Sequence, residues 1–279
     1  MTKAAAMSAR TMGAVADAAP AALAKERRGE IVVSGVSHRY GGMLALDSID
    51  LKIESGKFVV LVGPSGCGKS SLLMMLGGLG RPTQGNISCA GRPLVTPDPQ
   101  RVGIVFQEAS LFPWLTAQQN VEFPLKLRGV RKEERSDRAR AELDRVGLGG
   151  FRDKYPHELS GGMKQRASIA RGLVQDPPIL LMDEPFAALD EQTRLTMSDE
   201  LLRIWDRTRK TLVFVTHSLT EAVYLADEVV VMSGRPGKVI DRIDVDLPRP
   251  RTLSMISTPA FAAYRDRIWG QIRNPEERS

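Results

Sequence analysis

The stretch Gly63-Pro64-Ser65-Gly66-Cys67-Gly68-Lys69-Ser70 decides the fold of this chain. It fits the pattern G-x-x-x-x-G-K-[ST], in which glycines let backbone N–H groups turn inward on phosphate oxygens. The apolar residues 58–62 precede it and the helical residues 71–75 follow it, so the loop opens at a helix N-terminus, which itself favours anions. Lys69 is expected to reach the β- and γ-phosphates of a nucleotide, and Ser70 to ligate Mg²⁺. The alternative, a glycine-rich turn without a ligand, does not account for the flanking strand and helix.

A second, acidic motif closes the apolar run Ile179-Leu180-Leu181-Met182, where Asp183 and Glu184 follow directly. Asp183 is expected to hold Mg²⁺, directly or through water. Glu184 is placed to act as a general base on the water that attacks the γ-phosphate. Paired acids at a strand end can also cap the next helix. The phosphate loop earlier in the chain makes catalysis the better interpretation.

Fully apolar runs recur along the chain between helical stretches, which is the pattern of a buried parallel sheet. These runs are residues 58–62, 179–182, 212–215 and 229–232. Ahead of them, β-type runs begin at Ile31, and apolar residues 49, 51 and 53 alternate with polar ones as in a half-exposed strand. Between about residues 108 and 175 no strand run appears, and residues 131–146 have helical spacing. We therefore predict an α/β fold: a P-loop ATPase core with a mostly parallel sheet, an N-terminal antiparallel β layer and a helical insert.

The net charge of +6 lies in the two ends of the chain. Residues 1–28 carry five basic and two acidic groups, residues 247–279 carry six and three, and the remainder is balanced. A nucleic-acid-binding core is therefore disfavoured, while attraction of the tails to anionic lipid or another subunit stays open. The predicted organisation is a mobile N-terminal extension (1–28), an ATPase domain (29–246, with the insert at about 108–175) and a C-terminal helical tail (247–279).

The longest apolar runs are far shorter than the roughly 20 residues of a membrane-spanning helix. Any membrane role is therefore expected to come through a partner. Cys67 and Cys89 are too few for a disulfide framework, so a reducing cytoplasm is the simplest setting.

The class of nucleotide-binding protein is decided by Leu159-Ser160-Gly161-Gly162-Met163-Lys164-Gln165. This segment resembles the signature of the ABC ATPase family. In that family two ATPase subunits face each other head to tail. The resemblance implies that Ser160, Gly161 and Gly162 contact the γ-phosphate held by a second copy of the chain. Ser160 also suits a helix N-cap, and both roles can hold together because a helix start is an anion site.

Further elements similar to the ABC family appear in the expected order between about residues 31 and 239. By resemblance, Tyr40 stacks on adenine, Gln107 senses Mg²⁺ and the attacking water, Asp190 ends the D-loop Ala188-Leu189-Asp190, and His217 is the switch histidine. Taken one at a time, these residues would be interpreted as serving ordinary packing or as standing at the end of a strand without a function. The nucleotide contacts implied are Tyr40, Gly63, Pro64, Ser65, Gly66, Cys67, Gly68, Lys69, Ser70, Ser71, Ser160, Gly161, Gly162 and Asp190. The catalytic set is Glu184, His217 and Gln107, and the metal set is Ser70, Gln107 and Asp183.

Three segments resemble the nitrate, sulfonate and taurine importer group of that family: residues 111–116, residues 182–190 and Ser233-Gly234-Arg235-Pro236-Gly237. This resemblance implies a binding-protein-dependent importer whose ATPase lies peripherally on the cytoplasmic face of the inner membrane. Its partners would be a second copy of itself, transmembrane permease subunits and, indirectly, a solute-binding protein, with no nucleic acid. Leu111-Phe112-Pro113-Trp114 is expected either to help dock the permease or to form a buried turn. Pro124 and Met163-Lys164 depart from the usual residues and leave the solute undefined.

Other classes of protein use the same phosphate loop. A soluble ABC ATPase with a role in translation or DNA repair usually carries two ATPase halves or a long coiled-coil arm, and this sequence shows neither. A P-loop GTPase or small-molecule kinase would not explain residues 159–165, and the sequence has no Asn-Lys-x-Asp guanine-reading motif. The favoured prediction is the ATP-hydrolysing subunit of an ABC importer that uses ATP and Mg²⁺.

Overall fold

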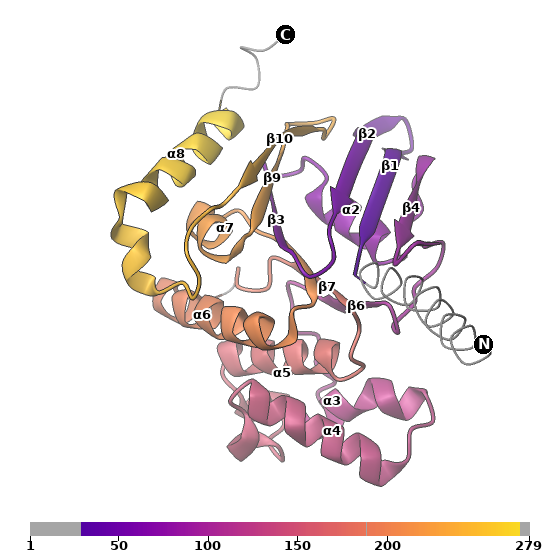
Figure 1. The fold of residues 1–279 in the computed structure, drawn as a ribbon. Coiled ribbons are helices and arrows are strands. Elements are labelled where there is room, and N and C mark those ends of the chain that lie inside the picture. Colours follow the sequence, from indigo (N-terminus) through magenta and orange to yellow (C-terminus); the bar gives the residue numbers. More distant parts are fainter. Residues whose placement is uncertain (1–28, 188, 274–279) are drawn as a thin grey trace, which may run out of the picture.

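The computed structural model of the chain describes residues 29–187 and 189–273. The predicted mobile extension, residues 1–28, lies outside these described residues, as does Ala188 of the predicted D-loop. Figure 1 shows two sheets side by side, with a group of helices at one end of the molecule.

The first sheet is antiparallel. Its strands lie in the order β2-β1-β4-β5 and are β1 (Ile31–Tyr40), β2 (Met43–Ile53), β4 (Gln84–Cys89) and β5 (Arg92–Pro93). In β2, Ile49, Leu51 and Ile53 are buried while Asp50 and Lys52 are exposed, because successive side chains of a strand face opposite sides. The predicted N-terminal antiparallel layer is therefore confirmed.

The second sheet is mostly parallel and has the order β10-β9-β3-β8-β7-β6. Its strands are β3 (Phe58–Val62), β6 (Val102–Val105), β7 (Ile179–Asp183), β8 (Thr211–Val215), β9 (Glu228–Met232) and β10 (Val239–Asp244), of which only β10 pairs antiparallel. Every residue of β3, β7, β8 and β9 is buried. A strand covered on both faces needs apolar side chains at successive positions, which explains the continuous hydrophobic runs of the sequence.

The parallel sheet separates two hydrophobic cores. Val59 and Leu61 face the core shared with the antiparallel sheet and α2 (Lys69–Leu76). Phe58, Val60 and Val62 face the core on the other side, which the remaining helices cover. Those helices include α6 (Glu191–Thr208), α7 (Leu219–Leu225), η3 (Leu253–Ser257) and α8 (Pro259–Arg273), together with the helices between β6 and β7.

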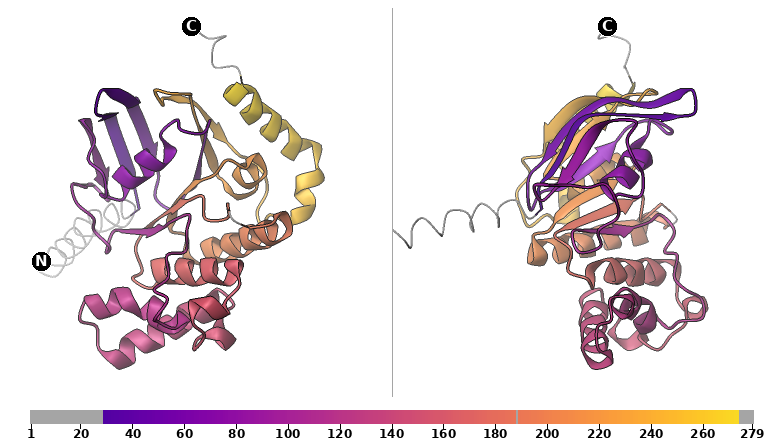
Figure 2. Two further views of the ribbon diagram at one scale, coloured as in Figure 1. Left: turned by 180° about the vertical axis from the view of Figure 1, so that it is seen from behind. Right: turned by 90° about the vertical axis from the view of Figure 1, so that its right-hand side faces the viewer.

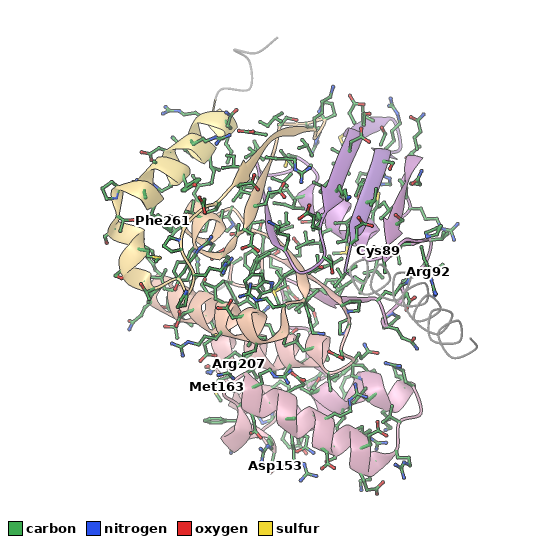
Figure 3. The ribbon with its side chains drawn as sticks, in the orientation of Figure 1. Cys89, Arg92, Asp153, Met163, Arg207 and Phe261 are labelled. Atoms are coloured by element: carbon green, nitrogen blue, oxygen red, sulfur yellow. The ribbon has the colours of Figure 1, made fainter. Side chains whose placement is uncertain are left out.

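The last helix, α8, packs against α7 and β9 and carries two fully buried side chains, Phe261 and Ile268. Figure 3 labels Phe261 on this helix. No helix among the residues that the structure describes is long and apolar enough to cross a membrane.

Helices fill the described chain between β6 and β7. They are α3 (Ala117–Leu127), α4 (Lys132–Arg145), η1 (Gly149–Phe151), η2 (Pro156–Glu158) and α5 (Gly161–Leu173). A capping box begins α3, because the side chains of Thr116 and Gln119 accept from each other's backbone N–H groups. Ser160 caps α5 as predicted, with its hydroxyl accepting from the Met163 N–H at 3.3 Å. Both views of Figure 2 place these helices together, away from the antiparallel sheet, which confirms the helical insert.

Candidate nucleotide site

The phosphate loop joins β3 to α2, as the sequence predicts. Gly63 allows a close approach of two chain segments, because an added Cβ would lie 2.7 Å from the carbonyl oxygen of Met232. Gly66 has φ +76°, a conformation that residues with side chains rarely adopt. Gly68 is the N-cap of α2 and offers no side chain to the helix, so the first N–H groups of α2 can serve an anion instead.

The ammonium group of Lys69 lies inside this loop. Its Nζ donates to the carbonyl oxygens of Gly63 at 2.9 Å and Pro64 at 3.0 Å. Only 6% of the residue is exposed. A buried charge that has only neutral partners is stabilised when an opposite charge binds to it. This ammonium group is therefore suited to bind a phosphate oxygen.

A hydroxyl and a carboxylate meet between α2 and β7. Ser70 Oγ donates to Asp183 Oδ1 at 3.0 Å. Burial raises the pKa of the Asp183 carboxyl, and the hydrogen bond from Ser70 opposes this shift. Hard oxygen donors of this kind, completed by phosphate oxygens and water, are what Mg²⁺ prefers, so the pair fits the predicted ion. The third predicted ligand, Gln107, is exposed after β6, and no hydrogen bond joins its side chain to this pair within the described residues.

Glu184 and His217 follow the neighbouring strands β7 and β8 and lie beside each other. His217 Nδ1 is 3.0 Å from Glu184 Oε2. The Glu184 N–H donates to the carbonyl oxygen of Val215 at 3.0 Å, which ties the turn after β7 to β8. Glu184 has φ +41°, and a side-chain-bearing residue held in this region carries strain on the order of 1 kcal/mol, a feature that clusters at functional sites.

An ion pair between a buried carboxylate and a half-buried guanidinium supports the turn that carries His217. The Thr216 hydroxyl donates to Glu221 of α7, and the second carboxylate oxygen of Glu221 lies 3.5 Å from Arg194 Nε of α6. Arg194 Nη2 also donates to the carbonyl oxygen of Leu189 at 3.1 Å. Burial raises the pKa of Glu221, with Thr216 and Arg194 acting in the opposite direction. The predicted D-loop and the histidine turn are therefore joined through two charged side chains.

An open cavity of about 260 Å³ lies over the phosphate loop. It is lined by Tyr40, Met43, Ala45, Ser65, Gly66, Gly68, Lys69, Ser70, Ser71, Glu184 and Arg235. Tyr40 is 54% exposed, and its hydroxyl lies 3.0 Å from Ser71 Oγ. An exposed ring held at the rim of a phosphate-binding cavity can stack on a purine base. Most of the residues predicted to bind phosphate and base are thus brought together, while Cys67 is buried beneath the loop.

The signature residues lie elsewhere in the same chain. Ser160 and Gly162 line a second hollow of about 320 Å³ with residues of α6. Gly161 begins α5, and Asp190 caps α6 by accepting from the Thr193 N–H at 2.9 Å. One copy of the chain therefore does not bring these four predicted contacts to its own phosphate loop.

Sequence reasoning missed three residues of the first cavity, Met43, Ala45 and Arg235. Arg235 stands in a segment that the sequence analysis used only for its resemblance to an importer group. No local pattern could have found the contact, because Arg235 meets Gly66, which is 169 positions away in the chain. Only the antiparallel turn between β9 and β10 brings the two together.

The predicted docking segment is partly exposed. Trp114 has 69% of its surface exposed and borders a cavity of about 470 Å³ between α3 and α4. Asn120 is fully buried and holds the turn, because its side chain accepts from the Phe112 N–H at 2.7 Å and donates to the carbonyls of residues 112, 115 and 116. The turn is thus fixed, with its indole facing outward rather than buried.

Comparisons with known proteins agree with this geometry. The family model for ABC transporters matches residues 46–187. The nitrate import ATP-binding protein NrtD of Synechocystis sp. is 47% identical over 242 residues, covering 85% of this chain and 91% of the relative. The bicarbonate transport ATP-binding protein CmpC of Synechococcus elongatus is 45% identical over 229 residues, covering 81% of this chain and 34% of the relative.

A solved structure shows the same fold. The dimeric ATP-binding cassette MJ0796 in a post-hydrolysis state, bound to ADP and phosphate, has a TM-score of 0.68 and 32% sequence identity. The match covers 78% of this chain and 100% of that chain. The chain therefore belongs to the ABC transporter family, as an ATP-binding subunit that hydrolyses ATP.

Proposed function

We propose that this chain energises a binding-protein-dependent importer of a small solute of the nitrate, sulfonate or taurine type. The observation that carries the catalytic part is the contact between Glu184 and His217 beside the phosphate-loop cavity. The transport part is supported by the similarity to a nitrate import protein. The similarity to a bicarbonate transport protein widens the range of solutes to be tested.

In this proposal the residues predicted for the site have separate tasks in phosphoryl transfer to water. Lys69 and the N–H groups at the start of α2 hold the phosphates, and Tyr40 stacks on adenine. Glu184 accepts a proton from the attacking water, and His217 keeps the γ-phosphate and that water in register. Ser70 and Asp183 would hold Mg²⁺, which supplies charge neutralisation at the phosphate oxygens. Gln107 would have to move toward the cavity to take part.

The complete site is proposed to need two copies of the chain, arranged head to tail. Ser160 caps a helix of 13 residues whose N-terminus is a suitable site for an anion. Because this end lines a hollow separate from the first cavity, the phosphate that it contacts would be held by the second copy. The dimeric relative supports this arrangement.

The permease is proposed to dock at the fixed turn that presents Trp114. An exposed indole beside a cavity of about 470 Å³ is an unusual surface for a chain without a partner. The chain would then sit peripherally on the cytoplasmic face of the membrane and contact the solute-binding protein only through the permease.

The proposal is tested by uptake of nitrate, bicarbonate, taurine and alkanesulfonates in cells that carry the intact permease. Glu184→Gln is expected to abolish uptake of one solute, and that solute is the cargo. The matched control is Glu133→Gln on the exposed face of α4, which should leave uptake unchanged. If Glu184→Gln changes the uptake of no solute in a wide panel, the importer assignment is wrong.

The division of roles within the cavity is tested with purified protein. Lys69→Ala is expected to lose tight nucleotide binding. Glu184→Gln should bind ATP, form an ATP-dependent dimer on gel filtration and scarcely hydrolyse the nucleotide. Equal loss of binding in the two variants would contradict these roles.

A further inference from the structure

The nucleotide cavity contains a cation to which the roles above give no task. Arg235 lies in the turn between β9 and β10 and lines the cavity beside Met43. Its Nε and Nη2 donate to the carbonyl oxygen of Gly66 at 3.3 and 3.2 Å. Its Nη1 lies 3.1 Å from the sulfur of Met43. The guanidinium therefore bridges the phosphate loop and the start of β2.

The turn that carries Arg235 is fixed to β2 by backbone hydrogen bonds and packs closely against the phosphate loop. The Gly237 N–H donates to the Ala45 carbonyl at 2.9 Å, and the Gly237 carbonyl accepts from the Asp47 N–H at 3.0 Å. A Cβ added at Gly237 would overlap the carbonyl oxygen of Cys67. Arg235 is therefore presented to the loop from a rigid support rather than from a free surface segment.

The contacts of Arg235 leave part of its donor capacity free for a ligand. A guanidinium has five N–H donors, and a thioether sulfur is a weak acceptor. A phosphate oxygen is charged, and hydrogen bonds to charged acceptors are roughly twice as strong as neutral ones. Exchanging Met43 sulfur for a phosphate oxygen would therefore be favourable.

The charge balance of the cavity agrees with this exchange. Its lining contains two cationic side chains, Lys69 and Arg235, and one carboxylate, Glu184. Lys69 approaches from inside the loop, whereas Arg235 approaches from the outer side, where it holds Gly66. The two cations thus flank the segment in which the phosphates are expected to lie.

We propose that Arg235 is a nucleotide-binding residue: it grips the Gly66 carbonyl with Nε and Nη2, and its Nη1 leaves Met43 to bind a phosphate oxygen of the nucleotide. The inference rests on the proposed nucleotide site. It adds a second cation to that site and does not depend on which solute is imported.

The test compares the affinities of the full chain for ADP and for adenosine, measured by calorimetry or by competition with a fluorescent nucleotide at low salt. Arg235→Ala is expected to weaken ADP binding about tenfold, which corresponds to about 1.4 kcal/mol, and to change adenosine binding less than about twofold. Arg235→Lys keeps the charge but cannot hold Gly66 and a phosphate together, so an intermediate loss is expected.

The matched control is Lys238→Ala. Lys238 carries the same charge on the same turn but pairs with Asp47 at 2.9 Å and does not line the cavity. Its replacement should leave ADP and adenosine binding within about twofold of the wild type, since a single exposed pair contributes little. Thermal unfolding checks that each variant folds, and Arg235→Gln replaces the alanine variant if that variant does not.

Two results would overturn the inference. One is an Arg235→Ala or Arg235→Gln variant whose ADP affinity equals that of the wild type. The other is an equal loss for adenosine and ADP, which would mean that Arg235 shapes the loop without contacting phosphate. A wild-type chain that binds neither ligand would instead contradict the nucleotide site itself, and with it the proposed function.

Discussion

The contact between Gly237 and the phosphate loop is so close that one added methyl group is expected to impair ATP hydrolysis. Real Cβ atoms stay at least about 3.0 Å from other heavy atoms, but the Cβ of an alanine at position 237 would come much closer than this to the carbonyl oxygen of Cys67. It would also lie 3.1 Å from Leu46 Cδ2. Since a normal carbon–oxygen contact is about 3.3 Å or more, one of the two backbones has to move by on the order of 1 Å.

The size of the effect follows from this displacement. Forcing an extra methyl into a packed region costs about 1–3 kcal/mol of folding free energy. A shift on the order of 1 Å in the groups that position a substrate can lower catalysis about 100-fold. Gly237→Ala should therefore fold with a lower melting temperature and lose between about ten and a hundred times in ATPase activity per nucleotide bound.

The assay is steady-state ATP hydrolysis together with ADP affinity, and Gly234→Ala on the same turn is the control. An added Cβ at Gly234 meets nothing within 4 Å. Neither glycine has a positive φ, so the backbone conformation at both positions suits alanine, and both substitutions reduce the entropy of the unfolded chain alike. Equal activities of the two variants would show that the turn and the loop separate freely, and the reasoning would fail.

Three further predictions concern stability and reactivity. Asn120→Ala should lower the free energy of unfolding by about 3 kcal/mol in urea titrations, because the part-buried Phe112 N–H and Leu115 carbonyl lose their hydrogen-bond partner; a loss below about 1 kcal/mol would contradict this. Burial raises the pKa of the Cys89 thiol from 9.0 to about 11, so its alkylation at pH 8 should be about a hundred times slower in the native than in the urea-unfolded chain, as mass spectrometry can measure. Burial also holds the pKa of Glu221 above 4.5, so the unfolded state ionises first and wild-type stability should fall as the pH rises from about 4.5 through the folded pKa. Glu221→Gln should lack that decline, and parallel stability curves for the two proteins would refute it.

Much of the fold was predictable because the parallel strands are buried on both faces. The apolar run at residues 58–62 coincides with β3, and the runs near β7, β8 and β9 differ from those strands by one residue. Glu184 could be predicted because it directly follows an apolar strand, whereas His217 was predicted only from the family resemblance. The structure places the two together because neighbouring parallel strands end at the same edge of a sheet.

The remaining features could not be read from local patterns. Arg235 is an exposed residue in a turn, and its contact with Gly66 depends on how a hairpin at the end of the chain folds over the loop. Met43 enters the cavity only because β2 passes beside that loop. Gln107 follows β6 as predicted, but its side chain is directed by the turn after the strand, and the structure leaves it exposed. Long-range packing decides the places of Arg235 and Met43, and a local turn decides that of Gln107; periodicity decides none of them.

The contacts between the D-loop and the histidine turn offer a route by which a second copy of the chain would influence hydrolysis. Leu189, next to the predicted D-loop aspartate, is held by Arg194, which also pairs with Glu221. Glu221 in turn accepts a hydrogen bond from Thr216, the neighbour of His217. A partner that pressed on the D-loop would therefore shift a partly buried, charged chain of contacts that ends beside Glu184. Because leaving the buried Glu221 carboxylate without partners would be costly, the two elements are expected to move as a unit, and a second copy in contact with the D-loop would then act on the position of His217.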